Sequence, residues 1–292
     1  MANKQYISPI RLFEFCHIDH NGDINLSRIR KQLSVEFDFA KSGFIEAGGN
    51  SYNKNDIIEE IERPDFLQRL QFHERLWQNK NILGLLENNT ININQLTESF
   101  TSFQGDKHFD EFFSPYFAGP FKNVSRKFLS AASYNNVGTL LLFEEFLQPQ
   151  DREEAFKAIR IFLEDNIQVF KNINSQNYGT FLPKLQHWTR FSWYSFLDNL
   201  PDEFYYLKNK IVVDLVNFTI KLQRSHKEDC KTISYELRQL QNIPDDLKQT
   251  IYSNHKVYTN TNSSSSSTGG YGWIIGVIIL LLKVVVFSRG CR

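Results

Sequence analysis

Residues 201–222 read PDEFYYLKNKIVVDLVNFTIKL and form the clearest helical pattern in the chain. Pro201 suits a first turn because no amide hydrogen is needed there, and the carboxylates of Asp202 and Glu203 complement the positive end of the helix dipole. Apolar side chains then recur every three or four residues, which places them on one helix face: Phe204, Leu207, Ile211, Leu215, Phe218 and Leu222. The segment predicts a long helix with one buried side.

Similar patterns follow this helix. Ser225 and Glu228 have the spacing of a capping box at the start of a further helix, and Pro244 with Asp245 starts a last one. The antiparallel helical bundle that these segments imply ends near Tyr258.

Helical patterns also precede it. We expect short helices over residues 56–62 and 65–77, separated by Pro64. A longer helix begins near Asp151, which forms a variant capping box with Glu154. Its apolar positions keep helical spacing: Phe156, Ile159, Leu163, Ile167 and Phe170.

The first fifty residues carry β signals instead. Residues 33–39 read LSVEFDF, whose strict apolar alternation predicts a half-buried strand. The Asn21–Gly22 pair, between residues 13–18 and 24–26, is typical of a hairpin turn. Two or three strands are not stable alone in water, so this element must pack on the helices. Gly48 and Gly49 indicate a further turn.

Taken together, the patterns predict a mainly α (α+β) fold with a small β element over residues 1–50 and a helical domain over residues 51–258. Within that domain, residues 105–121 hold aromatics among two glycines and two prolines, which favours a broken helix or loop. A Ser/Gly-rich linker is expected at residues 259–270 and a basic tail at residues 289–292.

Between linker and tail, residues 271–287 read YGWIIGVIILLLKVVVF, and no charge occurs from Val257 to Leu282. Eighteen helical residues, 271–288, reach roughly 27 Å, close to the thickness of a thin hydrocarbon core. We predict a single transmembrane helix rather than a buried core helix, because the stretch has no polar face. The membrane-embedded side chains are expected to be Trp273, Ile274, Ile275, Val277, Ile278, Ile279, Leu280, Leu281, Leu282, Val284, Val285, Val286 and Phe287.

The flanks of this segment bear on its orientation. Tyr271 lies at one predicted interface, while Lys283, Arg289 and Arg292 lie at the other. The positive-inside bias would keep the carboxyl end in the cytosol. We nevertheless expect the amino-terminal domain there, because it begins without a secretory signal and a five-residue tail is easily translocated. This is the tail-anchored arrangement.

Composition excludes a general affinity for nucleic acid, because 33 basic and 33 acidic residues give a net charge of zero. The chain is 14% aromatic, which supplies ample apolar material for a core. Cys16, Cys230 and Cys291 are too few and too distant for a metal knuckle or a disulfide framework, in agreement with a reducing compartment.

No catalytic or metal signature is complete. Residues 17–23 read HIDHNGD, but a calcium loop counted from Asp19 would have Ile24 in place of its glycine and Arg30 in place of its closing carboxylate. Glu14 with His17 gives a single Glu-x-x-His spacing where a di-iron bundle needs two. No metal or cofactor is indicated. A membrane-tethered hydrolase or metalloenzyme would need four side chains to converge in space: His73, His108, Asp110 and His187.

An adaptor or regulatory role is therefore the leading functional hypothesis: a tail-anchored membrane protein whose cytosolic domain binds unidentified protein partners beside the lipid bilayer. Aromatic pairs can form such interfaces. Trp188 with Trp193, and Tyr205 with Tyr206, are candidates, although most of these rings are expected in the core. The first alternative is a membrane-perturbing effector, since the residues at 272 and 276 are glycines that permit close helix contact.

Overall fold

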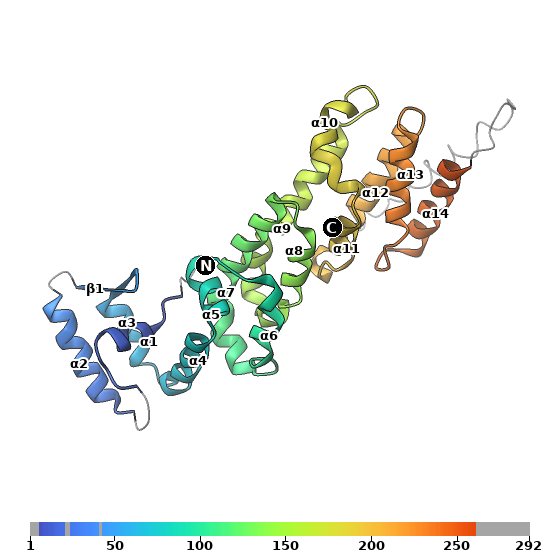
Figure 1. Cartoon of the computed structure of the whole chain (residues 1–292). Coiled ribbons are helices and arrows are strands. Elements are labelled where there is room, and N and C mark those ends of the chain that lie inside the picture. Colours follow the sequence, from blue (N-terminus) through green and yellow to red (C-terminus); the bar gives the residue numbers. More distant parts are fainter. Residues whose placement is uncertain (1–5, 21–23, 41–42, 261–292) are drawn as a thin grey trace, which may run out of the picture. The chain divides into compact units, whose positions relative to one another are not determined.

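The computed structural model describes residues 6–20, 24–40 and 43–260, which form fourteen α-helices and one two-stranded sheet (Figure 1). This confirms the predicted mainly α class with a small β element. The first helices and strands are α1 Pro9–Phe15, α2 Leu26–Phe39, β1 Phe44–Ala47, β2 Asn50–Asn53, α3 Lys54–Ile61, α4 Phe66–Gln78, α5 Lys80–Asn88, α6 Leu96–Thr101 and α7 Lys107–Ser130. The remaining helices are α8 Tyr134–Leu141, α9 Pro149–Asn172, α10 Tyr178–Leu185, α11 Phe191–Asp198, α12 Tyr205–Leu222, α13 Lys227–Leu237 and α14 Asp245–Thr259.

These residues divide into two compact units. Unit 1 takes the described residues up to Lys127 together with Leu142–Ala158, and unit 2 takes Phe128–Leu141 together with those from Ile159 onward. The division falls within α7 and α9, so each of these helices contributes to both units. The domain limits predicted near residues 50 and 258 stay predictions.

Residues 33–39 are helical, so the predicted strand is wrong. They belong to α2, which begins where the side chain of Asn25 accepts a hydrogen bond from the amide of Arg28 at 3.0 Å. Leu33 and Phe37 alternate with polar residues, but they are also four apart, and Ile29 extends the same buried stripe by one turn. Val35 and Phe39, which a strand would have buried, are exposed.

The described hairpin lies at Gly48 and Gly49, and the Asn21–Gly22 pair, where a turn was predicted, lies outside the described residues. Both glycines have positive φ, +57° and +82°, and they connect β1 to β2 in antiparallel register. Residues 13–15 close α1 and residue 26 opens α2, so the strands predicted there are absent from the described residues. The buried side chains of Ile45, Ala47 and Tyr52 join the core formed by α1 to α4.

Helix α7 runs unbroken through Pro115 and Pro120, where a loop or broken helix was predicted. A proline inside a helix costs about 3 kcal/mol because an amide hydrogen bond is lost. Burial of a continuous aromatic face offsets this cost: Phe109, Phe112, Phe113, Tyr116, Phe117 and Phe121 are all buried.

The starts of the later helices differ in detail from the predicted caps. Asp151 and Glu154 do not cap α9, which begins at Pro149; instead Asp151 accepts a hydrogen bond from Ser114 Oγ at 2.6 Å, and Glu154 pairs with Lys122. Both contacts fasten the start of α9 to α7. A 3₁₀ turn, Asp202–Phe204, precedes α12, and α13 is not capped by a side chain.

Helices α12, α13 and α14 follow one another in unit 2, with α13 packed against both neighbours (Figure 1). Across residues 6–20, 24–40 and 43–260, none of the helices has both the length and the hydrophobicity to cross a bilayer. The predicted linker from residue 261, the transmembrane helix and the basic tail lie outside the described residues.

Candidate functional site

The predicted metal-binding and acid–base residues do not form one site, and each has its own structural contacts. Glu14 accepts a hydrogen bond from Trp77 Nε1 at 2.9 Å, and His17 is an exposed residue with a φ of +54° after the end of α1. In the part of the chain that the structure describes, no three His, Cys, Asp or Glu side chains form a group that could hold a metal ion.

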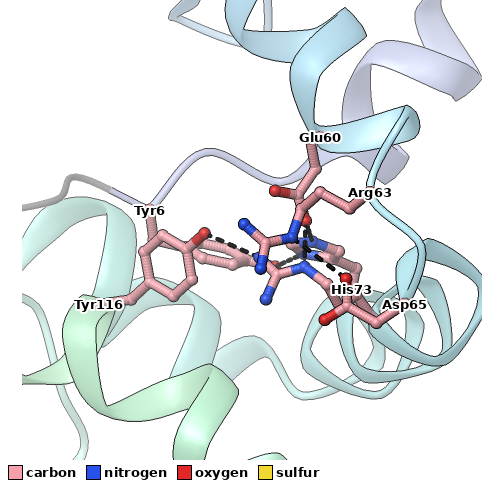
Figure 2. Close-up of polar contacts among 7 residues, drawn as sticks. Tyr6, Glu60, Arg63, Asp65, His73 and Tyr116 are labelled. Atoms are coloured by element: carbon pink, nitrogen blue, oxygen red, sulfur yellow. Dashed lines mark hydrogen bonds and ion pairs between the residues drawn. The ribbon is translucent and has the colours of Figure 1, made fainter.

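His73 belongs to a buried polar cluster in unit 1 (Figure 2). Its Nδ1 lies 3.0 Å from the hydroxyl of Tyr6, and its Nε2 lies 3.6 Å from Glu60 Oε1. The same Glu60 oxygen accepts a 2.5 Å hydrogen bond from Arg69 Nε, and Arg69 Nη2 donates to the hydroxyl of Tyr116 at 3.3 Å. The amino-terminal segment, α3, α4 and α7 therefore meet at these five side chains.

Charges within this cluster are already matched. Burial raises the pKa of Glu60, but hydrogen bonds from His73 and Arg69 together with their charges outweigh it and lower that pKa to about 2. Burial lowers the pKa of Arg69, but its pairing with Glu60 and Tyr116 raises it overall. A carboxylate this firmly ionised and paired is a poor general base. The cluster is best explained as a structural network.

The other acid–base candidates have separate surroundings. Asp106, just before α7, accepts a hydrogen bond from the amide of Phe109 at 3.1 Å and pairs with Arg75 at 3.2 Å, so this polar segment is a capped helix start. His108 is exposed on the first turn. Burial and the nearby Asp106 carboxylate raise the pKa of Asp110. His187, in unit 2, lies 3.1 Å from the side-chain oxygen of Asn166.

Neither described cysteine has the character of a nucleophile. Burial raises the pKa of Cys16 to about 11 and that of Cys230 to about 12. Because the thiolate is the reactive form, both thiols are inert at neutral pH. Cys291 lies outside the described residues.

An open groove in unit 1 lies between α2 and α3, and its cations are already paired. Arg30 pairs with Glu62 at 2.7 Å, and Arg63 pairs with Asp65 at 3.2 Å. Lys54 pairs with Asp38 at 2.7 Å. No cation of this groove needs a ligand to balance its charge.

A cleft in unit 2 contains a lysine that is not paired with a carboxylate. It has a volume of about 370 Å³ and is lined by Leu200, Asp202, Tyr205 and Lys208 on one side and by residues 241–245 on the other. Tyr205 and Lys208 belong to the start of α12, and Leu200 and Asp202 to the segment between α11 and α12. Residues 241–245 join α13 to α14. We call it the Lys208 cleft.

Lys208 is only 3% exposed. It forms no hydrogen bond or ion pair with any residue that the structure describes. Burial lowers the pKa of its amine, and the charges of Asp198 and Asp202 raise it only partly. Asp198 does not bond to Lys208, because its carboxylate accepts hydrogen bonds from the backbone amides of Gln241 and Asn242 at 2.9–3.2 Å. The cleft therefore holds a largely buried lysine whose amine has no direct counter-charge among the described residues.

An exposed tyrosine lines the cleft. Tyr205 is 53% exposed, and its neighbour in the chain, Tyr206, is 73% exposed but does not line the cleft. Trp188 and Trp193, the other aromatic pair considered as an interface, are both buried, so neither ring is available at the surface.

Lys208 was not recognised from the sequence, although a signal existed. It lies four residues after Phe204 and three before Ile211, inside the predicted apolar stripe of α12. A lysine at such a position faces the core unless its amine can reach solvent.

No protein-family model matches this sequence, and comparisons with curated proteins and with solved structures find no similar chain.

Proposed function

We propose that the chain is a tail-anchored, single-pass membrane protein whose helical domain, on the cytoplasmic side, binds a protein partner at the membrane surface. The observation that supports partner binding is the Lys208 cleft with the exposed ring of Tyr205 in its lining; Tyr206, the next residue of α12, is exposed as well. Tyrosine is enriched among the residues that dominate binding energy, since a rigid ring buries a large area at little entropic cost.

A partner also gains from the unmatched amine of Lys208. A buried cation without a counter-charge costs free energy in the unbound protein, and an acceptor supplied by a partner removes that cost. The cleft is thus a better binding site than the groove between α2 and α3, where each cation already has a carboxylate.

The membrane part of the proposal is supported by the sequence after α14. The described fold ends at Asn260, and the uncharged linker and the apolar residues 271–287 follow at once. About ten linker residues can extend to roughly 36 Å at most, which keeps unit 2 close to the bilayer. Tethering of this kind raises the effective concentration of the domain near membrane partners.

The test compares full-length chains in their native membranes. The wild type should resist extraction by alkaline carbonate, and photo-crosslinking should capture a specific partner. Replacing Tyr205 and Tyr206 together by alanine should abolish capture. Tyr235→Ala is the matched control, because this ring is also 53% exposed but lies on α13, outside the cleft.

The proposal fails if carbonate releases the wild type. It also fails if capture survives the double substitution, or is lost equally in Tyr235→Ala.

A further inference from the structure

We infer that the Lys208 cleft receives a carboxylate of the partner polypeptide, with Lys208 as its charge partner and Tyr205 as the contact at the rim. This inference rests on the proposed function and specifies the chemistry that the partner must present.

The first argument is the state of Lys208 itself. The Lys208 side chain is 3% exposed and lines the cleft, and its amine forms no direct bond with the described residues. Lys210, two residues further along the same helix, shows the ordinary solution: its amine contacts both carboxylate oxygens of Asp214 at 3.2 Å. Lys208 has no such neighbour within its own helix, so an external anion can supply the hydrogen-bonded counter-charge that its amine lacks.

The second argument is the backbone around the cleft. Helix α14 starts at Asp245, which is a cleft-lining residue. Amide groups at the start of a helix favour a negatively charged group. The start of α14 and the unpartnered amine of Lys208 therefore favour an anion over a neutral ligand.

The third argument limits the charge of that anion. Asp202 and Asp245 are exposed at the rim, and Asp245 pairs with Lys248 at 3.6 Å. These carboxylates repel a group of two or more negative charges, such as a phosphate, more strongly than a singly charged carboxylate. The cleft volume of about 370 Å³ is at the small end of the roughly 300–1,000 Å³ range of ligand sites and has room for one side chain or one chain terminus.

The test uses the full-length protein in detergent micelles with lysine carbon-13 labelled at Cε. The Lys208 resonance is assigned by its loss in Lys208→Arg. Two pairs of peptides serve as probes: acetyl-Tyr-Glu-amide against acetyl-Tyr-Gln-amide, and acetyl-Ala-Tyr with a free carboxyl terminus against its amide.

We expect the acid of at least one pair to shift the Lys208 resonance and to bind about tenfold or more tightly than its amide, because a charge-assisted hydrogen bond is lost in the amide. The pair that discriminates identifies the source of the carboxylate, a side chain or a chain terminus. The Lys210 resonance is the internal control and should not move.

The inference is overturned if acids and amides bind equally, if Lys210 shifts as much as Lys208, or if no probe shifts Lys208 at concentrations up to about 10 mM. Lys208→Met gives an independent check: retention of the acid preference by this variant overturns the inference. Failure of the carboxylate inference is distinguishable from failure of the proposed function. Peptide discrimination without tyrosine-dependent capture overturns partner binding alone, and capture without peptide discrimination overturns the carboxylate assignment alone.

Discussion

Lys208→Met should stabilise the protein at neutral pH, because the wild-type lysine places a charged side chain in the protein interior without a counter-charge. Its side chain is 3% exposed and its amine lacks a direct partner among the described residues. Methionine keeps an unbranched chain of similar length, so packing along α12 is retained while the charge is removed.

The magnitude follows from the cost of burying a polar group without a hydrogen bond, which mutational data place at about 1–3 kcal/mol. Replacing buried charges by apolar residues of similar volume gives gains of the same order. Because the Lys208 amine keeps contact with the solvent of the cleft, we expect the free energy of unfolding to rise by about 1 kcal/mol, the low end of this range, and each kcal/mol corresponds to about 2–4 °C in melting temperature for a domain of this size.

The pH dependence supplies a second readout. The folded pKa of Lys208 is lowered from the ordinary 10.5, so protonation is less favourable in the folded than in the unfolded state. The destabilisation is complete below the folded pKa and disappears as the pH rises toward 10.5. The stability difference between Lys208→Met and the wild type should therefore shrink at alkaline pH.

Calorimetry or chemical denaturation of the full-length protein in micelles measures both effects. Lys210→Met is the control, since this lysine forms an i,i+4 pair with Asp214 that is worth only about 0.3–0.5 kcal/mol. A fall in melting temperature for Lys208→Met would refute the reasoning, because it would mean that the amine is stabilised in the folded state.

Two further predictions concern unit 1. The folded pKa of Glu60 is lowered from 4.5 to about 2, so its contribution of roughly 3 kcal/mol is complete above pH 4.5 and is lost as the pH falls toward 2. Glu60→Gln should lose this part of the acid transition in pH-dependent denaturation, whereas Glu62→Gln, which breaks an exposed ion pair, should not. Phe100 is fully buried with ring centroids of Phe143 and Phe146 at 4.7 Å, so Phe100→Ala should cost about 3–5 kcal/mol in urea denaturation. Leu142→Ala, at a side chain that is 67% exposed, should change stability by less than about 0.5 kcal/mol, and similar losses in both variants would contradict the packing argument.

Sequence alone determined the features that depend on neighbours a few residues away. The apolar stripe of α12, the helices α3 and α4 and the turn at Gly48 and Gly49 were all predicted from local spacing and turn chemistry, and the structure confirms each of them. The apolar segment at residues 271–287 is likewise a property of the sequence, and its membrane role stays a prediction.

Tertiary packing decided what local patterns left ambiguous. Leu33 and Phe37 fit both an alternating strand and a helix of four-residue spacing, and the choice depends on burial of Ile29 with them in the core of unit 1. The prolines of α7 favour a break, but rings packed on that helix, such as Phe100 beside Phe113 at 5.6 Å, stabilise the unbroken form.

The candidate site depends on tertiary structure for the same reason. Helical spacing places Lys208 on the buried side of α12, but a lysine there can extend to solvent when nothing covers it. Residues 241–245, which lie more than thirty positions away in the sequence, form the other wall of the cleft. Burial of the Lys208 side chain without a counter-charge arises only when distant segments meet, because desolvation depends on all surrounding atoms rather than on adjacent residues.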